Sequence, residues 1–315
     1  MLKEEYHSTV NETKSNTIID KTIRVLKKNN ILAAVPFLLP SIMGFMAFTF
    51  IPIIATLLLS FFNWSLLDKP SFVGLDNFIQ LFTNDPSFIK VVINTFYYVS
   101  VYLILNIIFA IGLAVWLTQQ VKGLVVFRAL MFFPVLIPPV AIALIWQWIY
   151  DKNNGLFNIF LEWIGIQGPN WLGDIKFAML ALIIATLWQY VGYNMLIFMA
   201  AIKGIPPSLY EAASLDGAGF IAKFKHVTLP LLTPAIFFAG VMTLINTFQT
   251  FDLVFALTNG GPGQSTEILG LYVYNNAFMW FKMGYGSSIA VVMFIFILII
   301  TILQLKFQKR WVHYE

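Results

Sequence analysis

The sequence predicts an all-α membrane protein with six transmembrane helices and both termini in the cytoplasm. Of its 315 residues, 59% are hydrophobic and only 11% are charged, and the mean hydropathy is +0.80. Soluble domains carry roughly 25% charged residues, so this composition argues strongly against a water-soluble enzyme. The chain has no cysteine, which rules out disulfides and cysteine-based catalytic or metal sites.

The charged residues are clustered, and the gaps between the clusters locate the helices. A helix needs about 20 apolar residues to cross a bilayer, and six windows without Asp, Glu, Lys or Arg are long enough: 29–67, 91–121, 129–150, 177–202, 226–251 and 283–305. Residues 104–115 and 291–303 are almost continuously apolar, whereas the strands of a transmembrane barrel alternate polar and apolar residues. We therefore predict a tail over 1–28, a six-helix transmembrane domain over 29–305 and a tail over 306–315. The spans lie at about 31–62, 91–118, 129–150, 177–202, 230–251 and 284–305.

The basic residues predict the orientation of the chain. Six spans place both termini on one side, and that side carries 14 of the 19 Lys and Arg residues. Loops rich in Lys and Arg stay in the cytoplasm, so both termini are predicted to be cytoplasmic, in a prokaryotic plasma membrane. The polar 1–28 stretch has no apolar core of the kind a signal peptide needs.

Missing motifs narrow the function further. No Gly-x-x-x-x-Gly-Lys-Ser/Thr nucleotide-binding motif occurs, and the middles of the six windows contain no ionisable side chain for ion coupling. The three histidines, His7, His226 and His313, lie in loops or tails. The sequence thus predicts no catalytic residue, no metal site and no cofactor in this chain.

The loop between the fourth and fifth spans, 203–229, is predicted to contain a short helix. Pro206 and Pro207 should end the fourth span. Ser208 followed by Glu211 forms a capping-box pattern that would start a new helix, and Gly217 is suited to end it in a left-handed conformation. Leu209, Ala212, Ala213 and Asp216 follow helical spacing, giving a small face suited to docking in a groove. The alternative is that this face lies on the membrane or on the chain's own helices.

This loop carries a family resemblance. Glu211-Ala212-Ala213, three residues, Gly217, nine residues and Val227-Thr228-Leu229-Pro230 resemble the EAA loop of binding-protein-dependent ABC importer permeases, with Val227 in place of the family's Ile. The chain resembles the maltose-type carbohydrate-uptake branch over nearly its whole length, through landmarks that follow the family's order: 72–78 (FVGLDNF), 169–174 (PNWLGD), 210–219 and 258–263 (TNGGPG).

The resemblance implies a mechanism and a set of partners. Two homologous permease subunits would form the pathway, two cytoplasmic ATPase subunits would bind ATP and Mg, and an extracytoplasmic binding protein would deliver a sugar. Each permease would insert its EAA-loop helix into a cleft of an ATPase. The residues carried over to this coupling role are Glu211, Ala212, Ala213, Asp216, Gly217, Leu229 and Pro230.

Polar residues inside two spans are the candidates for the substrate path. On the fourth span Thr186, Gln189, Tyr190, Tyr193 and Asn194 recur at three-residue and four-residue spacing; on the fifth the candidates are Asn246, Thr247, Gln249 and Thr250. Neutral amides, hydroxyls and aromatic rings suit an uncharged, polyhydroxylated ligand. The competing interpretation is that these groups hold helices together by hydrogen bonds. The resemblance favours the path, because the family places its sugar contacts on these two spans. Asn94, Asn106 and Gln147 are assigned to structure.

Two other classes of function stay open on the residues alone. A free-standing secondary carrier for a neutral solute would leave Glu211 and Gly217 without a partner. A membrane scaffold or assembly factor would not need polar groups facing the interior of the bundle. The identity of the sugar is not encoded in any feature of the sequence.

Overall fold

The computed structural model describes residues 30–119 and 123–312. Most of these residues are helical. The predicted tail over 1–28 and the last three residues of the predicted tail over 306–315 lie outside the described part of the chain. The chain divides after Leu58 into two compact units.

The first unit contains the first predicted span. It comprises α2 (Asn30–Phe45), the π-helical turn η1 (Met46–Phe50) and most of α3 (Ile51–Leu59). The stretch Val35–Leu59 is long and apolar enough to cross a membrane. Pro36 and Pro40 lie inside α2, a position that membrane helices tolerate better than soluble ones.

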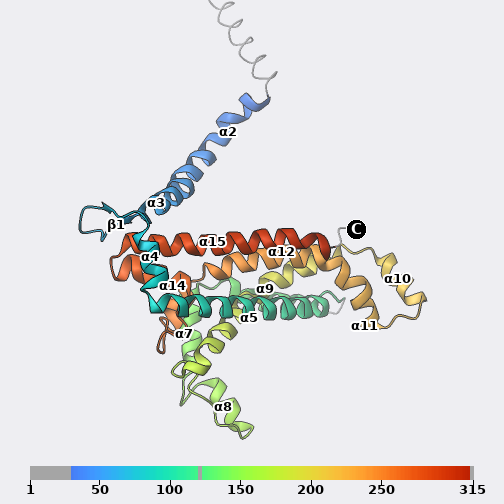
Figure 1. Ribbon diagram of the computed structural model, residues 1–315. Helices are drawn as coiled ribbons and strands as arrows, with labels where there is room; N and C mark the ends of the chain where they lie inside the picture. The colour runs from blue at the N-terminus through green and yellow to red at the C-terminus, as the bar shows by residue number, and fades with distance from the viewer. Residues whose placement is uncertain (1–29, 120–122, 313–315) are drawn as a thin grey trace, which may run out of the picture. The chain divides into compact units, whose positions relative to one another are not determined.

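The second unit is built around four long helices. These are α5 (Pro86–Leu117), α9 (Ile175–Lys203), the span Phe220–Phe248 and α15 (Met283–Phe307). The third of these runs without a break through α11 (Phe220–Lys223), the π-helical η3 (Phe224–Thr228) and α12 (Leu229–Phe248). Figure 1 shows α5, α12 and α15 lying alongside one another, and α9 packs along α5.

Small residues allow α5 and α9 to pack closely. Ala178, Ala181 and Ala185 recur on one face of α9 with no exposed surface, as do Ala110 and Ala114 on α5. Small side chains let the backbones of membrane helices approach, which favours van der Waals contact where the hydrophobic effect is absent. As a result α9 is the most enclosed of the spans.

The third predicted span, 129–150, is not one straight helix. It falls on α6 (Leu124–Phe132), the 3₁₀ turn η2 (Phe133–Leu136) and α7 (Pro139–Ile149), and the two halves are bent by 106°. Ile137 is extended, with ψ 132° at the end of η2, because a residue close before a proline pair avoids helical geometry. The described residues therefore contain five helices able to span a membrane, and six spans if the bent pair counts as one.

Close backbone contact fixes this bend against α9. A side chain at Gly192 would place its Cβ 2.1 Å from the carbonyl oxygen of Met131, so only glycine fits there. The Gln189 amide donates to the Ile137 carbonyl at 3.2 Å, at the break itself. The bend is thus held by two residues of α9 that lie one turn apart.

The remaining elements are short and lie between the spans. They are β1 (Phe62–Asn63) paired antiparallel with β2 (Ser71–Phe72), α4 (Asp76–Thr83), α8 (Leu156–Trp163), α10 (Pro207–Leu215), α13 (Asp252–Leu257), α14 (Leu269–Tyr274), the π-helical η4 (Asn275–Met279) and the 3₁₀ turn η5 (Gln308–Arg310). We call the end of the second unit that holds α4 and α14 the α4 end, and the opposite end the α10 end (Figure 1).

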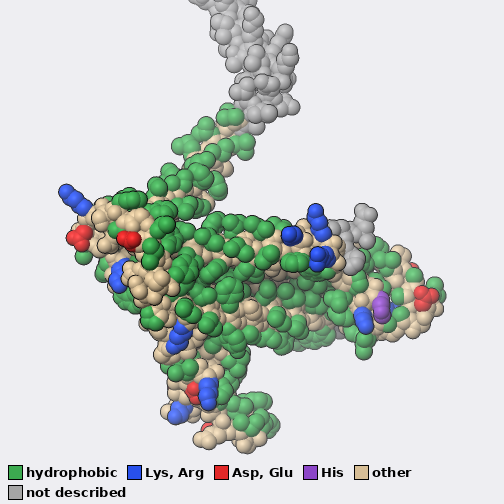
Figure 2. All heavy atoms as spheres, viewed as in Figure 1, with side chains coloured by type: hydrophobic (Ala, Val, Ile, Leu, Met, Phe, Trp, Pro, Cys, Tyr) green, Lys and Arg blue, Asp and Glu red, His purple; other side chains and the backbone are tan. Residues whose placement is uncertain are grey.

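Charged and apolar side chains separate along this unit. In Figure 2 hydrophobic side chains cover the long flanks of the helices, while Lys, Arg, Asp and Glu gather toward the two ends and on the projection that carries α7 and α8. Ile108, Phe109, Phe294 and Ile299 are among the exposed apolar residues of the flanks. An apolar belt between two charged ends is the pattern expected of helices that sit in a bilayer.

Candidate functional site

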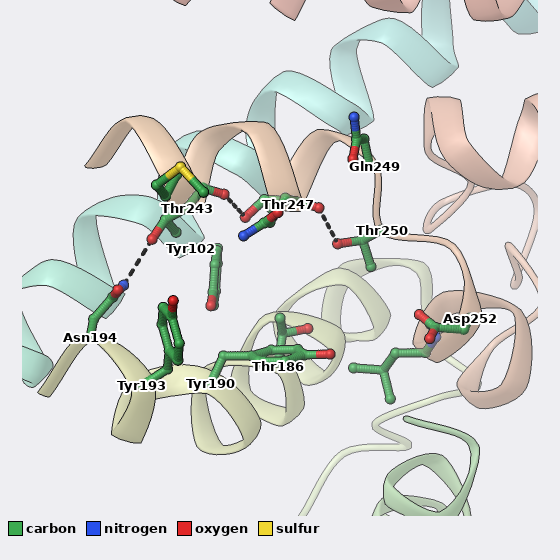
Figure 3. Close-up of a pocket in the computed structure, with 13 residues that line it drawn as sticks. Tyr102, Thr186, Tyr190, Tyr193, Asn194, Thr243, Thr247, Gln249, Thr250 and Asp252 are labelled. Atoms are coloured by element: carbon green, nitrogen blue, oxygen red, sulfur yellow. Dashed lines mark hydrogen bonds between the residues drawn. The ribbon is translucent and has the colours of Figure 1, made fainter. Parts of the chain in front are cut away.

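A cavity of about 350 Å³ opens between α5, α9, α12 and α13 (Figure 3). Its walls combine hydroxyls, amides and tyrosine rings with two apolar side chains. The lining residues are Tyr102, Thr186, Tyr190, Tyr193, Asn194, Met242, Thr243, Asn246, Thr247, Gln249, Thr250, Asp252 and Leu253. Such a mixture suits a ligand that offers many hydroxyl groups and some apolar surface.

The structure brings together every predicted substrate-path residue except Gln189. Thr186, Tyr190, Tyr193 and Asn194 share one face of α9, as their spacing predicts. Asn246 and Thr247 lie in the last turn of α12, whereas the helix ends at Phe248 and leaves Gln249 and Thr250 in the break that follows.

The buried members of this set are already hydrogen-bonded to protein. The Asn194 amide donates to Thr243 Oγ1 at 2.8 Å and also to Asn106 Oδ1, whose own amide donates to the Tyr102 hydroxyl at 3.1 Å. Thr186 Oγ1 donates to the Leu182 carbonyl at 2.8 Å, and Thr247 Oγ1 donates to the Thr243 carbonyl at 2.6 Å. The Asn194 bonds join α9 to α5 and α12, whereas the two threonine bonds close within their own helices.

The exposed members are free to meet a ligand. Tyr193, Asn246 and Gln249 are exposed, and their side chains make no hydrogen bond within the described part of the chain. The half-buried Tyr190 points its hydroxyl into the same space in Figure 3. The polar residues of α9 and α12 therefore have two roles. The buried ones are hydrogen-bonded within the protein, and the exposed ones form the free surface of the cavity.

Gln189 and the residues assigned to structure lie outside the cavity. Gln189 faces the bend at Ile137, and its Oε1 is buried without a partner among the described residues. Asn94 donates to the carbonyls of Gln264 and Glu267 at 2.8 and 3.1 Å, and Gln147 donates to Ala256 O at 2.8 Å. Each of these amides satisfies backbone carbonyls where a helix has ended.

Sequence reasoning missed five lining residues: Tyr102, Met242, Thr243, Asp252 and Leu253. Tyr102 had a signal, because it stands one turn from Asn106 on the second span. Asp252 is the first charged residue after the fifth window, so the charge pattern places it at the start of a loop. Only the break after Phe248 turns it toward the cavity.

At the α10 end, the predicted short helix is present but starts differently. It begins at Pro207, its N-cap is Pro206, and no side chain caps it, so the predicted Ser208–Glu211 capping box is wrong. Proline at the first helical position has no N–H to satisfy and a fixed φ suited to a helix. Pro207 thus starts the helix and places Ser208 inside it.

Gly217 ends this helix as predicted. Its φ is +76°. The Ala218 N–H donates to the Ala213 carbonyl at 2.9 Å, and the Gly217 N–H donates to the Ser214 carbonyl at 3.1 Å. This pair of bonds defines a Schellman motif, which requires a left-handed residue at that position.

The helix exposes most of its surface. None of its residues is buried against the described part of the chain. Glu211, Ala212 and Asp216 are exposed, and Leu215 keeps 90% of its surface accessible. Within the described residues, its one side-chain hydrogen bond to another element joins the hydroxyls of Tyr210 and Thr228 at 3.0 Å.

The predicted coupling residues fall into two places. Glu211, Ala212, Ala213, Asp216 and Gly217 occupy α10 and its C-terminal turn. Leu229 and Pro230 begin α12 and are half-buried there. The Tyr210–Thr228 contact connects the two places.

Comparisons with known proteins agree with this architecture. Residues 107–313 match the family described as binding-protein-dependent transport system inner membrane component. The chain is 40% identical to the probable ABC transporter permease protein YesP of Bacillus subtilis, over 94% of this chain and 96% of that protein. It is 32% identical to the trehalose/maltose transport system permease protein MalF of Thermococcus litoralis, over 85% and 91% of the two chains. A solved bacterial alginate ABC transporter, in complex with a periplasmic protein that holds an alginate pentasaccharide, contains a chain with the same fold. That chain has a TM-score of 0.79 at 22% identity, over 91% of this chain and 96% of that one.

Proposed function

The chain belongs to the family of binding-protein-dependent transport system inner membrane components, and we propose that it is the permease subunit of an ABC importer that moves a sugar into the cytoplasm. Members of this family are multi-pass membrane transport subunits rather than enzymes. The proposed substrate is a di- or oligosaccharide or a related polyol or glycoside. MalF of Thermococcus litoralis, by its name, belongs to a trehalose/maltose system.

The observation that carries the proposal is the cavity inside the bundle. Its free groups are the hydroxyls of Tyr190 and Tyr193 and the amides of Asn246 and Gln249. These can donate to and accept from sugar hydroxyls, while tyrosine rings cover the apolar faces of a pyranose. The cavity is placed among spanning helices, which is where a transport path must lie.

The exposed α10 supports the assignment of energy coupling to a second protein. A helix with no buried residue, ended by a fixed Schellman turn, presents Glu211 and the small residues Ala212 and Ala213 to a partner. We assign it as the coupling helix that enters a cleft of a cytoplasmic ATPase subunit. ATP and Mg bind to that partner, and Leu229 and Pro230 transmit its movement to α12.

This assignment predicts an orientation and an assembly. The α10 end is cytoplasmic together with both termini, in agreement with the distribution of Lys and Arg. The α4 end faces the binding protein. The complete importer contains a second homologous permease, two ATPase subunits and an extracytoplasmic sugar-binding protein, and closure of the ATPases switches the cavity between inward and outward access.

Affinity purification from the native membrane tests the assembly. The tagged chain, extracted in mild detergent, is expected to bring with it a second permease and an ATPase, identified by mass spectrometry. Recovery of the chain alone, in a form that still transports solute into vesicles without ATP, would favour a secondary carrier.

Substitution at the cavity tests the transport path. Thr250→Leu removes a lining hydroxyl that donates to the Asn246 carbonyl at 3.3 Å, and it is expected to lower sugar uptake about tenfold with the complex intact. Thr83→Leu is the matched control, because Thr83 makes the same kind of bond to Ile79 on α4, away from the cavity. Equal uptake by both variants would assign Thr250 to packing.

A further inference from the structure

The cavity holds a single formal charge. Among the 13 residues that line it, Asp252 is the only ionisable group other than tyrosine, and no Lys, Arg or His reaches the wall. Asp252 is exposed and makes no ion pair within the described residues. The surface offered to a ligand is therefore negative at one point and neutral elsewhere.

This carboxylate is placed by a break in the backbone. The helix α12 ends at Phe248, and the turn that follows bonds Thr250 N to Thr247 O at 3.2 Å. Asp252 then starts α13, where its Oδ1 accepts from the N–H of Leu253 at 3.0 Å. Its second oxygen has no partner in the described residues and is free to accept from a ligand.

The short helix behind Asp252 is held firmly. Leu253, Val254 and Leu257 are buried in the main core of the unit. Gln147 on α7 donates to the carbonyls of Ala256 and Leu257 at 2.8 and 3.3 Å. Because α13 is anchored, the Asp252 carboxylate cannot easily move away when an anionic ligand enters the cavity.

Figure 3 shows the polar side chains that share the cavity with Asp252. Tyr190 directs its hydroxyl toward the side of the cavity where Asp252 lies, and Gln249 and Thr250 stand on the same segment as Asp252. All three are neutral. A bound anion would meet the carboxylate with no cation among the lining residues to offset the repulsion.

We propose that Asp252 is a specificity-determining residue that accepts hydrogen bonds from the hydroxyls of uncharged or cationic sugars and rejects sugars that carry a carboxylate, sulfonate or phosphate. The inference rests on the proposed sugar-importing function. Two like charges repel far more strongly in a partly enclosed cavity than in open water, whereas a carboxylate accepts hydroxyl donors in short, strong hydrogen bonds.

The structurally similar alginate transporter limits what the fold alone can say. Alginate is an acidic polysaccharide, and the transporter that imports it shares this fold. The fold by itself therefore does not exclude an anionic substrate, and the inference rests on the side chains of the cavity.

Three monosaccharides with the same pyranose ring test the proposal. Glucose is neutral, glucuronate is anionic and glucosamine is cationic at neutral pH. The binding of each to the purified complex, reconstituted in nanodiscs without the binding protein, is measured by saturation-transfer NMR. The wild-type protein is expected to bind glucose and glucosamine about tenfold or more tightly than glucuronate.

The isosteric variant Asp252→Asn removes the charge by replacing the carboxylate with an amide of similar shape. It is expected to bring the affinities for glucose and glucuronate to within about twofold, since the electrostatic penalty is gone. Asp76→Asn is the matched control, because Asp76 is exposed in the first turn of α4, changes the net charge by the same amount and does not line the cavity.

The outcomes separate this inference from the function on which it rests. An unchanged ratio of glucose to glucuronate affinity in Asp252→Asn would overturn the role of Asp252 and leave the importer intact. Binding of none of the three sugars, in a preparation that contains the ATPase, would also overturn it. Absence of the ATPase and of a second permease from the purified complex would instead overturn the function.

Discussion

The two ends of the second unit are built in opposite ways. At the α4 end, side chains of α5 tie down a segment about 170 residues away: Lys90 Nζ donates to Gly263 O at 2.6 Å, and Thr95 Oγ1 accepts from Leu269 N at 2.9 Å. Asp85 accepts from the hydroxyls of Tyr272 and Tyr285. At the α10 end, the helix α10 has no buried residue and makes one side-chain hydrogen bond to another element in the part of the chain that the structure describes.

The difference separates an end that is tied together by its own side chains from an end that leaves a helix uncovered. Several side-chain hydrogen bonds of the α4 end are made within the chain, and they hold this end in one shape. The helix α10 is preformed by its two ends but contributes almost nothing to the chain's own core. A helix that is fixed in shape and left uncovered is suited to a partner's groove.

Asp85→Ala is expected to have the largest effect, because it removes the carboxylate that accepts several hydrogen bonds at the α4 end. Asp85 Oδ1 also accepts from the N–H groups of Ser87 and Phe88 at 3.0 and 3.2 Å and so caps α5. Loss of a cap costs about 1 kcal/mol, and each bond to a charged acceptor about 1.5–3 kcal/mol. We expect a loss of several degrees in melting temperature, measured on the purified complex.

Asp85→Asn is the control for that change, since an amide oxygen still caps the helix and accepts a hydroxyl. It should recover part of the lost stability. Equal melting temperatures for wild type and Asp85→Ala would mean that the α4 end is held by its apolar cluster of Leu81, Phe88, Val91 and Leu269 alone.

Glu211→Lys tests the α10 end. It reverses a charge on the exposed face of α10 without touching a buried group, so the melting temperature of the isolated subunit should not change. Recruitment of the ATPase is expected to fall tenfold or more, since like charges across an interface suppress binding. The amount of ATPase that co-purifies with the tagged chain measures the effect, and normal recruitment would remove Glu211 from the coupling role.

Gly217→Val is expected to have an intermediate effect confined to the end of α10. A β-branched residue resists a φ of +76°, at a cost of about 1–2 kcal/mol. Apart from Gly217 and its chain neighbours, no atom of the described residues lies within 4 Å of the added Cβ, so strain rather than collision is the cause. ATP-driven uptake should drop a few-fold, and Gly217→Asn, which tolerates this conformation better, should retain more of it. Uptake at the wild-type level in Gly217→Val would show that the turn can relax without loss of coupling.

The polar face of α9 could be predicted from sequence, because helical spacing continues unbroken through Thr186, Tyr190, Tyr193 and Asn194. The termination of α10 was equally accessible, since a left-handed turn needs glycine. In both cases the local pattern determines the geometry. Burial by other elements does not alter it.

Features that depend on a broken helix were missed. Pro138 and Pro139 carry the same signal as the proline pair before α10, yet their window lacks charges and was read as one straight span. Asp252 was assigned to a loop, because nothing local shows that α12 stops at Phe248. Gln189 shares the polar spacing of α9 but faces the bend at Ile137, a contact between distant segments that no helical pattern contains.

The smallest expected effect concerns Glu267, a buried carboxyl at the α4 end. Burial raises its pKa, and the nearby Asp85 raises it further, against the opposing effects of its hydrogen bond from Asn275 and the charge of Lys90. A carboxyl whose pKa is raised in the folded state stabilises the fold at low pH. That contribution is lost as the pH rises from the ordinary pKa of glutamate through the raised pKa of Glu267.

Glu267→Gln should therefore melt slightly higher than wild type at neutral pH, and the gap should close at pH 4, where both side chains are uncharged. The hydrogen bond from Asn275 at 2.9 Å is retained by the amide oxygen, so the comparison isolates the charge. Melting curves of the two proteins over pH 4–8 measure the gap, and a gap that widens toward pH 4 would reverse the sign assigned to this carboxyl. Asp85→Ala and Glu267→Gln together show what each carboxylate does for the α4 end. The Asp85 carboxylate is expected to stabilise this end by accepting hydrogen bonds, whereas the buried charge of Glu267 is expected to destabilise it.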